Sequence, residues 1–264
     1  MKLGIIGTYG AFNPADFDAA KARGLSFVEY CINVGCDWQA FAASADEINA
    51  AVARTGVTVG SIGRWGTARI TADGPIAEEM EADKALIRTA AKVGCPVFVC
   101  GCNRVEGLSE FENCQLAIHY FQELLDLGKE VGVKIALYNC RWNNFVCCDP
   151  YWTLILGRLP DLGIKYDASH CINESDNDYL TEIRDWGRRF YHVHIKGTLK
   201  IGGQHVDDPP AGLDMINWNA LMGMLYAVGY DGNLSIEPHS AVWQGELGEK
   251  GVDYTIRYIR ERML

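Results

Sequence analysis

Two hydrophobic patterns alternate along the whole chain. Each short apolar run is followed by a longer segment in which apolar residues recur every three or four positions. Short apolar runs are typical of buried strands, and the three-to-four spacing is typical of amphipathic helices. The expected strands are residues 2–7, 26–31, 57–62, 96–102, 133–139, 163–167, 190–196 and 233–237. The expected helices are residues 14–24, 45–56, 78–94, 111–132, 150–158, 176–188, 217–228 and 251–262.

This regular alternation predicts a parallel sheet with right-handed crossover connections. Gly56, Gly94 and Gly132 stand where a helix ends and a strand follows directly, as C-terminal caps do. Eight strand–helix units in 264 residues match the length of a (β/α)8 TIM barrel. An open doubly wound sheet ranks second, because "GTYGAFNP" after the first strand is not a GxGxxG phosphate turn. No linker interrupts the pattern, so we expect residues 1–264 to form a single domain.

Candidate chemistry gathers at the ends of the last three strands. In "RFYHVHIKG", His192, His194 and Lys196 are two residues apart and therefore point to one face of a strand. Barrel active sites form at the carboxyl ends of strands, where Asp167, His194 and Glu237 stand on three successive strands. Singly, a helix cap, a core histidine and an ion pair would explain these three residues. Together, two carboxylates and one imidazole favour a divalent metal site.

Composition narrows the functional classes. A formal net charge of −10 argues against binding to nucleic acid or to an anionic membrane surface. No apolar run approaches the roughly 18 residues of a membrane span, and "MKLGIIGTYG" has the pattern of a strand and not of a leader. With ten cysteines in a long chain, we expect a cytoplasmic protein with buried, reduced thiols. Cys100 and Cys102 have no second pair at zinc-ribbon spacing.

Three motifs in the second half of the chain resemble one known family. "IKYDASH", "YHVHIKG" and "AGLDMINWNALMGMLYAVGYDGNLSIEPH" are similar to motifs of the xylose isomerase-like TIM barrels. The resemblance covers nearly the whole chain. Members of the family include sugar phosphate isomerases/epimerases, ketose 3-epimerases, inosose isomerases and dehydratases, and endonuclease IV. The endonuclease reading is disfavoured by the acidic charge and by a total of six histidines, too few for a trinuclear site.

The resemblance implies roles for individual residues. Asp167, His194 and Glu237 match the family's metal ligands, with Mn²⁺ ranked first and Co²⁺, Zn²⁺ or Mg²⁺ as alternatives. His170 matches a residue that contacts substrate. In ketose epimerases an arginine six residues past the ligand histidine binds substrate, and here that position is Lys200, which lacks the bidentate guanidinium fork.

One departure from the family concerns the fifth strand. The family's fourth ligand is a glutamate in a pattern like ALEN, whereas this chain reads "IALYNCRWNN". Asn139 could coordinate through its amide oxygen with lower affinity, and Tyr138 could supply a phenol as acid or oxyanion donor. Because that glutamate is one of two acid/base groups in the epimerases, its absence disfavours two-base epimerisation.

The predicted function is a divalent-metal-dependent isomerase or epimerase of a keto sugar or inosose. Glu237 or His170 would remove the proton α to the carbonyl and so form an enediolate. The first alternative is a lyase or dehydratase that uses the same site for β-elimination on a 3-keto sugar or glycoside, which needs one base only. The second is a metal-poor, non-catalytic sugar-binding or scaffold subunit.

The carbohydrate is the expected partner, and many relatives form dimers or tetramers. The side chains expected to contact it are Lys196, Lys200, Tyr138, Arg141, Trp142, Trp65 and His205. His192 lies deeper in its strand and is expected to orient a carboxylate from behind. No phosphate cradle is evident, and the sequence does not indicate which sugar is bound.

Overall fold

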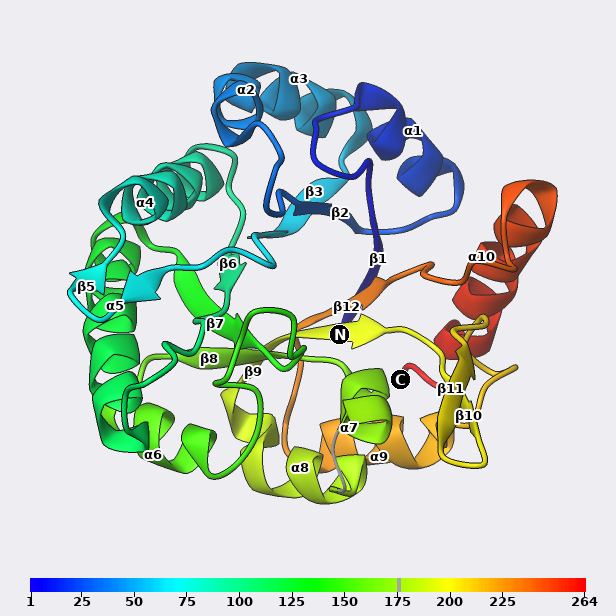
Figure 1. Cartoon of the computed structure of the whole chain (residues 1–264). Coiled ribbons are helices and arrows are strands. Elements are labelled where there is room, and N and C mark those ends of the chain that lie inside the picture. Colours follow the sequence, from blue (N-terminus) through cyan, green and yellow to red (C-terminus); the bar gives the residue numbers. More distant parts are fainter. Residues whose placement is uncertain (175–176) are drawn as a thin grey trace.

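A computed structural model describes residues 1–174 and 177–264 and contains a closed barrel of parallel strands (Figure 1). Its strands, in chain order, are β1 (Lys2–Ile6), β2 (Phe27–Cys31), β3 (Thr58–Gly63), β6 (Val97–Cys100), β7 (Lys134–Tyr138), β8 (Gly163–Tyr166), β9 (Phe190–Ile195) and β12 (Asn233–Ile236). Neighbours in the chain are neighbours in the barrel, and β12 closes it against β1. The predicted single-domain (β/α)8 TIM barrel is therefore confirmed.

Helices surround the barrel (Figure 1). They are α1 (Pro14–Ala22), α2 (Trp38–Ala43), α3 (Ala45–Thr55), α4 (Ala77–Lys92), α5 (Glu110–Val131), α6 (Tyr151–Arg158), α7 (Ala168–Glu174), α8 (Tyr179–Trp186), the 3₁₀ turn η1 (Gly187–Arg189), α9 (Trp218–Ala227) and α10 (Gly245–Arg260). All eight expected helices have a counterpart, but the expected start of one at residue 176 lies outside the described residues. The short helices α2 and α7 were not predicted, and α10 begins at Gly245, before the expected residue 251.

The longest helix shows why these boundaries can be read from sequence. At its start, the Ser109 hydroxyl accepts the backbone N–H of Glu112, while the Glu112 carboxylate accepts the N–H of Ser109. This reciprocal capping box satisfies two otherwise unpaired donors. At its end, Gly132 takes φ 78°, a left-handed conformation that costs glycine nothing.

A layer of one large and two small residues fills the lower barrel and supports the site above it. A Cβ atom on Gly4 would lie 2.4 Å from the Phe27 ring, and one on Gly60 would lie 2.2 Å from it. Only glycine on β1 and β3 leaves room for this ring, which projects from β2 between them. The next ring upward is His192, whose centroid is 5.9 Å from that of Phe27 in an edge-on arrangement.

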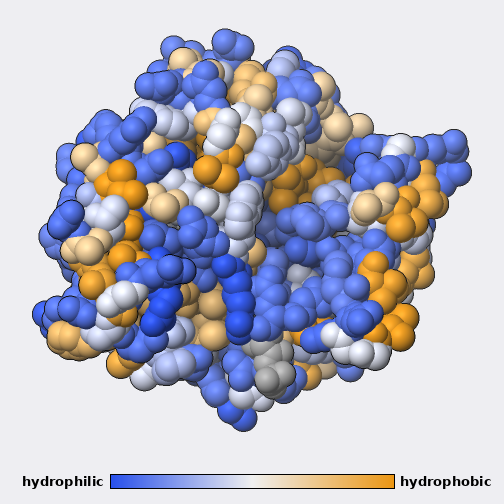
Figure 2. Space-filling view, in the orientation of Figure 1, coloured by the Kyte–Doolittle hydropathy of each residue, from blue (hydrophilic) through white to orange (hydrophobic). Residues whose placement is uncertain are grey.

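Two hairpins not expected from the sequence extend beyond the barrel: β4–β5 (Ile70–Thr71 and Gly74–Pro75) and β10–β11 (Leu199–Ile201 and Gln204–Asp207). The second hairpin is fastened beside the barrel mouth by Asp208. One Asp208 oxygen lies 2.8 Å from His205 Nε2, and the other lies 3.0 Å from His239 Nδ1. Figure 2 shows hydrophilic side chains over the centre of this face and apolar ones along the edge where β10 and β11 stand. Ile201 and Val206 of the hairpin are exposed.

Two expectations from composition are also addressed by the structure. The side chains of Cys100 and Cys102 are buried, and neither belongs to a potential metal-ligand group found among the described residues. Within residues 1–174 and 177–264, no helix combines the length and apolar character needed to cross a bilayer.

Candidate functional site

Asp167, His194 and Glu237 meet at the carboxyl ends of β8, β9 and β12. One ligand atom from each lies within 4.8 Å of the others. His194 Nδ1 is 2.7 Å from Glu237 Oε2 and 4.0 Å from Asp167 Oδ2. In the sheet, β9 lies between β8 and β12, so the imidazole stands between the two carboxylates. The structure thus brings together the three residues that the sequence placed at strand ends.

Asp167 carries the most unusual atom of the site. Its Oδ1 accepts the backbone N–H of Ser169 at 2.9 Å, whereas its Oδ2 is buried without a hydrogen-bond partner among the described residues. Besides His194 Nδ1, three nitrogens approach Oδ2: His170 Nε2 at 3.5 Å, Lys165 Nζ at 3.9 Å and Lys196 Nζ at 4.0 Å. Burial alone would raise the pKa of Asp167, but these neighbours outweigh it and lower the pKa to about 2.

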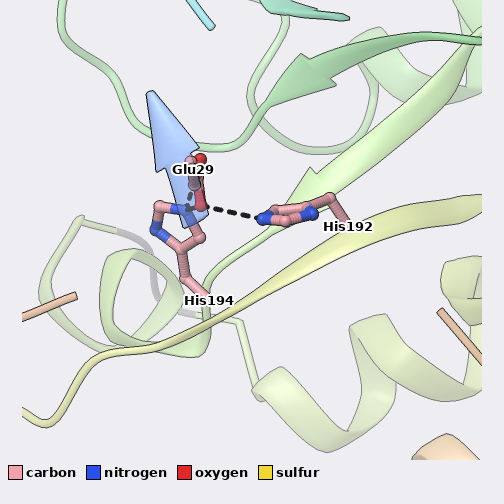
Figure 3. Close-up of side chains that lie close together, drawn as sticks. All are labelled: Glu29, His192 and His194. Atoms are coloured by element: carbon pink, nitrogen blue, oxygen red, sulfur yellow. Dashed lines mark hydrogen bonds and ion pairs between the residues drawn. The ribbon is translucent and has the colours of Figure 1, made fainter. Parts of the chain in front are cut away.

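Beneath this group, Glu29 of β2 lies between two histidines of β9 (Figure 3). Its Oε2 is 2.9 Å from His192 Nε2 and 2.9 Å from His194 Nε2. All three side chains are buried. Burial favours the neutral carboxyl, yet His194 and His192 hold the pKa of Glu29 well below its usual range. Glu29 is therefore an anion that fixes the orientation of both imidazoles.

This arrangement leaves one nitrogen of His194 with two alternatives. With Nε2–H donated to Glu29, Nδ1 can carry a proton and donate to Glu237, or keep its lone pair for a cation. Burial opposes the charged imidazole, but Glu29 and Glu237 prevail and raise the pKa of His194. Burial dominates at His192 and lowers its pKa, which keeps that ring neutral.

Asn139 has a different geometry from that expected of a fourth ligand. Its Oδ1 accepts the backbone N–H of Asp167 at 2.9 Å, and its Nδ2 donates to the carbonyl of Asp167 at 2.8 Å. The side chain thus continues the β7–β8 pairing beyond the end of the strands and anchors Asp167. Its amide faces the main chain of Asp167 instead of the carboxylates.

A pocket of about 600 Å³ opens above the site, a size suited to a small ligand. Its lining includes six residues expected from the sequence and two further basic residues. The expected residues are His170, His194, Lys196, Glu237, Trp65 and Trp142. The additional residues are Lys165 and His239. Lys196 and Glu237 both line this pocket. Burial opposes the charge on each, but each favours the charged form of the other: the pKa of Lys196 is raised and that of Glu237 is lowered.

Four residues expected to bind substrate do not line this pocket and have other contacts. The Tyr138 hydroxyl donates to the Trp142 carbonyl at 3.0 Å. Lys200 Nζ donates to the Ile172 carbonyl at 2.8 Å and so ties β10 to α7. These residues, together with Arg141 and His205, shape the loops of the mouth instead of its inner surface.

Sequence reasoning assigned no role to two buried, charged residues of the site. Lys165 stands two positions before Asp167 and therefore on the same face of β8. Glu29 is an acidic residue in a fully buried strand. In both cases a charged side chain inside an apolar strand was the available signal, because a buried charge requires a partner.

Comparisons with known proteins agree with this fold. The family model described as xylose isomerase-like TIM barrel matches residues 17–262. A 3-keto-D-glucoside 4-epimerase from E. coli has a TM-score of 0.75 and 18% identity, with 99% of each chain covered. D-psicose 3-epimerase from Clostridium cellulolyticum H10, solved with D-tagatose, has a TM-score of 0.76 and 14% identity, with 100% of this chain and 99% of that chain covered.

A third solved structure, of an IOLI protein with a bound zinc atom, has a TM-score of 0.73 and 15% identity. The match covers 99% of this chain and 96% of the IOLI chain. A comparison with curated proteins found no match. At these identities the solved structures establish the fold, and the family model, which spans most of the sequence, establishes the membership. The chain belongs to the xylose isomerase-like TIM barrel family.

Proposed function

We propose that this protein is a divalent-metal-dependent enzyme that isomerises or epimerises a keto sugar or inosose. The observation that carries the proposal is the buried, unpartnered Oδ2 of Asp167, which lies within reach of His194 and Glu237. A buried carboxylate oxygen without a hydrogen bond is costly unless a ligand completes it. Two structurally similar proteins are epimerases, which supports the choice of reaction class.

The residues fit a divalent cation. Asp167 Oδ2, His194 Nδ1 and Glu237 Oε2 would hold it, and Glu29 would hold the opposite nitrogen of His194, as carboxylates commonly do behind ligating histidines. When bound, such a cation polarises a carbonyl and stabilises the adjacent oxyanion. The mixed oxygen and nitrogen donor set suits Mn²⁺, Co²⁺ or Zn²⁺, and the zinc of the IOLI structure is consistent with it.

The chain's own groups would move the proton. Glu237 projects into the pocket with 19% of its side chain exposed and remains ionised, so it can accept the proton α to a carbonyl. His170 is the second candidate, because it lines the same pocket and its Nδ1 lies 3.1 Å from the Glu174 carboxylate. Lys196 would stabilise the enediolate oxygen. Returning the proton to another carbon, or to another face, completes the reaction.

Elimination is a second candidate reaction, and one observation favours it. Family epimerisation uses two carboxylates, whereas here Asn139 is committed to the main chain of Asp167 and Tyr138 to a loop carbonyl. A single base suffices when the substrate carries a leaving group β to the abstracted proton. A 3-keto glycoside would then lose its aglycone from the same enediolate.

The test combines metal analysis with proton exchange. Protein loaded with Mn²⁺ and then desalted should retain about one ion per chain, and the Asp167→Asn/Glu237→Gln double variant should retain none. Asp73→Asn, an exposed carboxylate change, is the matched control and should retain the ion. In D₂O, the wild-type protein should incorporate deuterium α to the carbonyl of at least one of five candidates: D-fructose, D-tagatose, 2-keto-D-gluconate, an inosose and a 3-keto glucoside.

The outcomes separate the candidate functions. Deuterium incorporation with a new sugar epimer or isomer supports the proposed reaction. Release of an aglycone indicates the lyase. If neither the wild type nor the Asp73→Asn variant retains metal and no substrate exchanges a proton, the enzyme proposal fails, and a sugar-binding or scaffold role remains.

A further inference from the structure

We infer that the sugar accepted by this site carries a carboxylate, which binds between Lys165 and Lys196. This inference rests on the proposed function and specifies its substrate class: a keto-sugar acid instead of a neutral ketose. It depends on a lysine pair that the pocket presents to its ligand.

The two lysines are buried yet face the cavity. Lys165 is 1% exposed and Lys196 5% exposed, and both line the pocket. Their nearest carboxylate oxygen is Asp167 Oδ2, at 3.9 Å and 4.0 Å, which is beyond hydrogen-bond distance. Lys165 Nζ also lies 5.8 Å from the centroid of the Trp65 ring. An ammonium group has three donors, so both lysines retain donors for a ligand.

Charge balance decides what that ligand is. Two ammonium groups, or one divalent cation, would each be enough to neutralise Asp167 and Glu237. With both present, two positive charges remain, and Glu29 balances only one of them. Glu174 lies on the far side of His170 with 30% of its side chain exposed to solvent. Asp208 also attracts the Lys196 ammonium, but its two oxygens are already engaged by His205 and His239. The buried part of the metal-loaded site therefore lacks one negative charge, which a substrate carboxylate supplies.

A carboxylate matches this single excess positive charge better than a phosphate does. A phosphate ester brings close to two negative charges and is typically held by arginine or by backbone N–H groups at a helix start. Among the described residues that line the pocket, none is an arginine. The pocket instead offers two ammonium groups that lie near each other, because both approach Asp167 Oδ2 to within 4.0 Å. Such a pair matches the two oxygens of one carboxylate.

The competing explanation is that both lysines serve only the enediolate of a neutral sugar. That intermediate carries a single developing charge, and one cation beside it already meets this need. The two explanations differ in the ground state. Only a carboxylate-bearing substrate would bind more tightly before any proton moves, and binding can be measured without turnover.

Calorimetric binding of matched ligands to the Mn²⁺-loaded protein tests the inference. D-fructose, 2-keto-D-gluconate and D-fructose 1-phosphate share one carbon chain and carry a hydroxymethyl, a carboxylate or a phosphate ester at C1. We expect the acid to bind at least about tenfold more tightly than fructose. Lys165→Met should lower the affinity for the acid by about 10- to 100-fold and the affinity for fructose by about threefold or less. Lys134 is the first residue of β7, at the end of the strand away from the pocket. Lys134→Met is therefore the matched control and should change neither affinity.

The Lys165→Met variant also separates lysine binding from chelation, because an α-keto acid can chelate the metal without any lysine. Circular dichroism establishes that it is folded, and Lys196→Met provides a second variant of the pair. The inference is overturned if the acid binds no more tightly than fructose, if Lys165→Met leaves acid binding unchanged, if the phosphate ester binds best, or if no probe binds. The deuterium exchange assay with neutral ketoses is independent of these results, so the proposed function can stand when the substrate class fails.

Discussion

Three acidic side chains define the site at the scale of single residues, and each is charged for a different reason. Glu29 is ionised by two histidines, Asp167 by lysines and His170, and Glu237 by Lys196 and His194. Glu29 does not line the pocket, and its side-chain contacts are with His192 and His194. Its effect on chemistry therefore acts through His194, which makes it a positioning residue.

Changing Glu29 to Gln should weaken metal binding without removing a ligand. The amide can accept from one histidine only and presents an N–H₂ group to the other, so His194 loses its fixed orientation. We expect Mn²⁺ affinity to fall by about 10- to 100-fold, measured by calorimetry or by electron paramagnetic resonance. Glu106→Gln, at an exposed position, should leave the affinity unchanged. Equal affinity in the Glu29→Gln variant would show that the histidine orientation is set by packing alone.

At the scale of elements, the site rests on a rigid base and is flanked by a fastened hairpin. The base is the layer of Gly4, Phe27 and Gly60 in the lower barrel, with His192 next above it. Beside the barrel mouth stands the β10–β11 hairpin, fastened through Asp208 to His205 and His239. The base depends on close packing, whereas the hairpin depends on charge.

Adding a methyl group to the base should destabilise the barrel. A Cβ on Gly60 would overlap the Phe27 ring, which lies in a closed barrel and has no room to move. We expect Gly60→Ala to lower the free energy of unfolding by about 1–3 kcal/mol, measured by urea denaturation. Gly223→Ala is the contrasting control, because nothing lies near that Cβ on helix α9, and it should stabilise by about 0.5–1 kcal/mol. If Gly60→Ala and Gly223→Ala changed the free energy of unfolding by the same amount in the same direction, this packing account would be wrong.

The hairpin fastening should weaken as pH rises. The hydrogen bond to Asp208 raises the pKa of His239, although burial opposes it, so the pair stabilises the fold fully below about pH 6.5. That contribution is lost as pH rises through the folded pKa. His239 is largely exposed, and Lys196 and Glu237 also act on it, so we expect less than about 1 kcal/mol.

Hydrogen exchange can measure this effect on the hairpin. After correction for intrinsic rates, amides of residues 199–207 should exchange faster at pH 8.5 than at pH 6. His239→Gln should abolish the difference, while the amides of β7 serve as an internal control in the same samples. A pH difference that survives in the variant would assign the effect to another group.

At the scale of the whole molecule, buried carboxylates should govern acid stability. Folding lowers the pKa of Asp167 from an ordinary value near 4 to about 2, and it lowers those of Glu29 and Glu237 well below their usual range. A lowered folded pKa gives stability that is present above the unfolded value and is lost as pH falls through the folded value. The loss should therefore occur between about pH 4 and pH 2, and Asp167 alone should account for about 2 kcal/mol.

Urea unfolding in EDTA across this range measures the loss without a contribution from metal. The wild-type free energy of unfolding should fall steeply below pH 4, and Asp167→Asn should show a shallower slope. The exposed Asp73→Asn change should leave the slope as in the wild type. Parallel curves for wild type and Asp167→Asn would mean that the Asp167 charge is not coupled to folding.

The local sequence pattern determined the barrel strands and most of the helices. Strand and helix periodicities, with glycine caps such as Gly132, predicted every barrel strand and therefore which residues end them. Because parallel strands end at the same face, Asp167, His194 and Glu237 could be expected together from the sequence. Short elements such as α2 and the β10–β11 hairpin were missed, because they have too few residues to show a period.

Tertiary structure alone decided which side chains meet. Glu29 contacts His192 across 163 residues of sequence, and only the closure and register of the barrel bring β2 opposite β9. The same register directs Lys165 to the Asp167 oxygen, turns Asn139 toward the main chain of Asp167 and takes Lys200 away to Ile172. Strand periodicity gives the face on which a side chain lies, but its partners depend on distances between strands that one sequence does not contain.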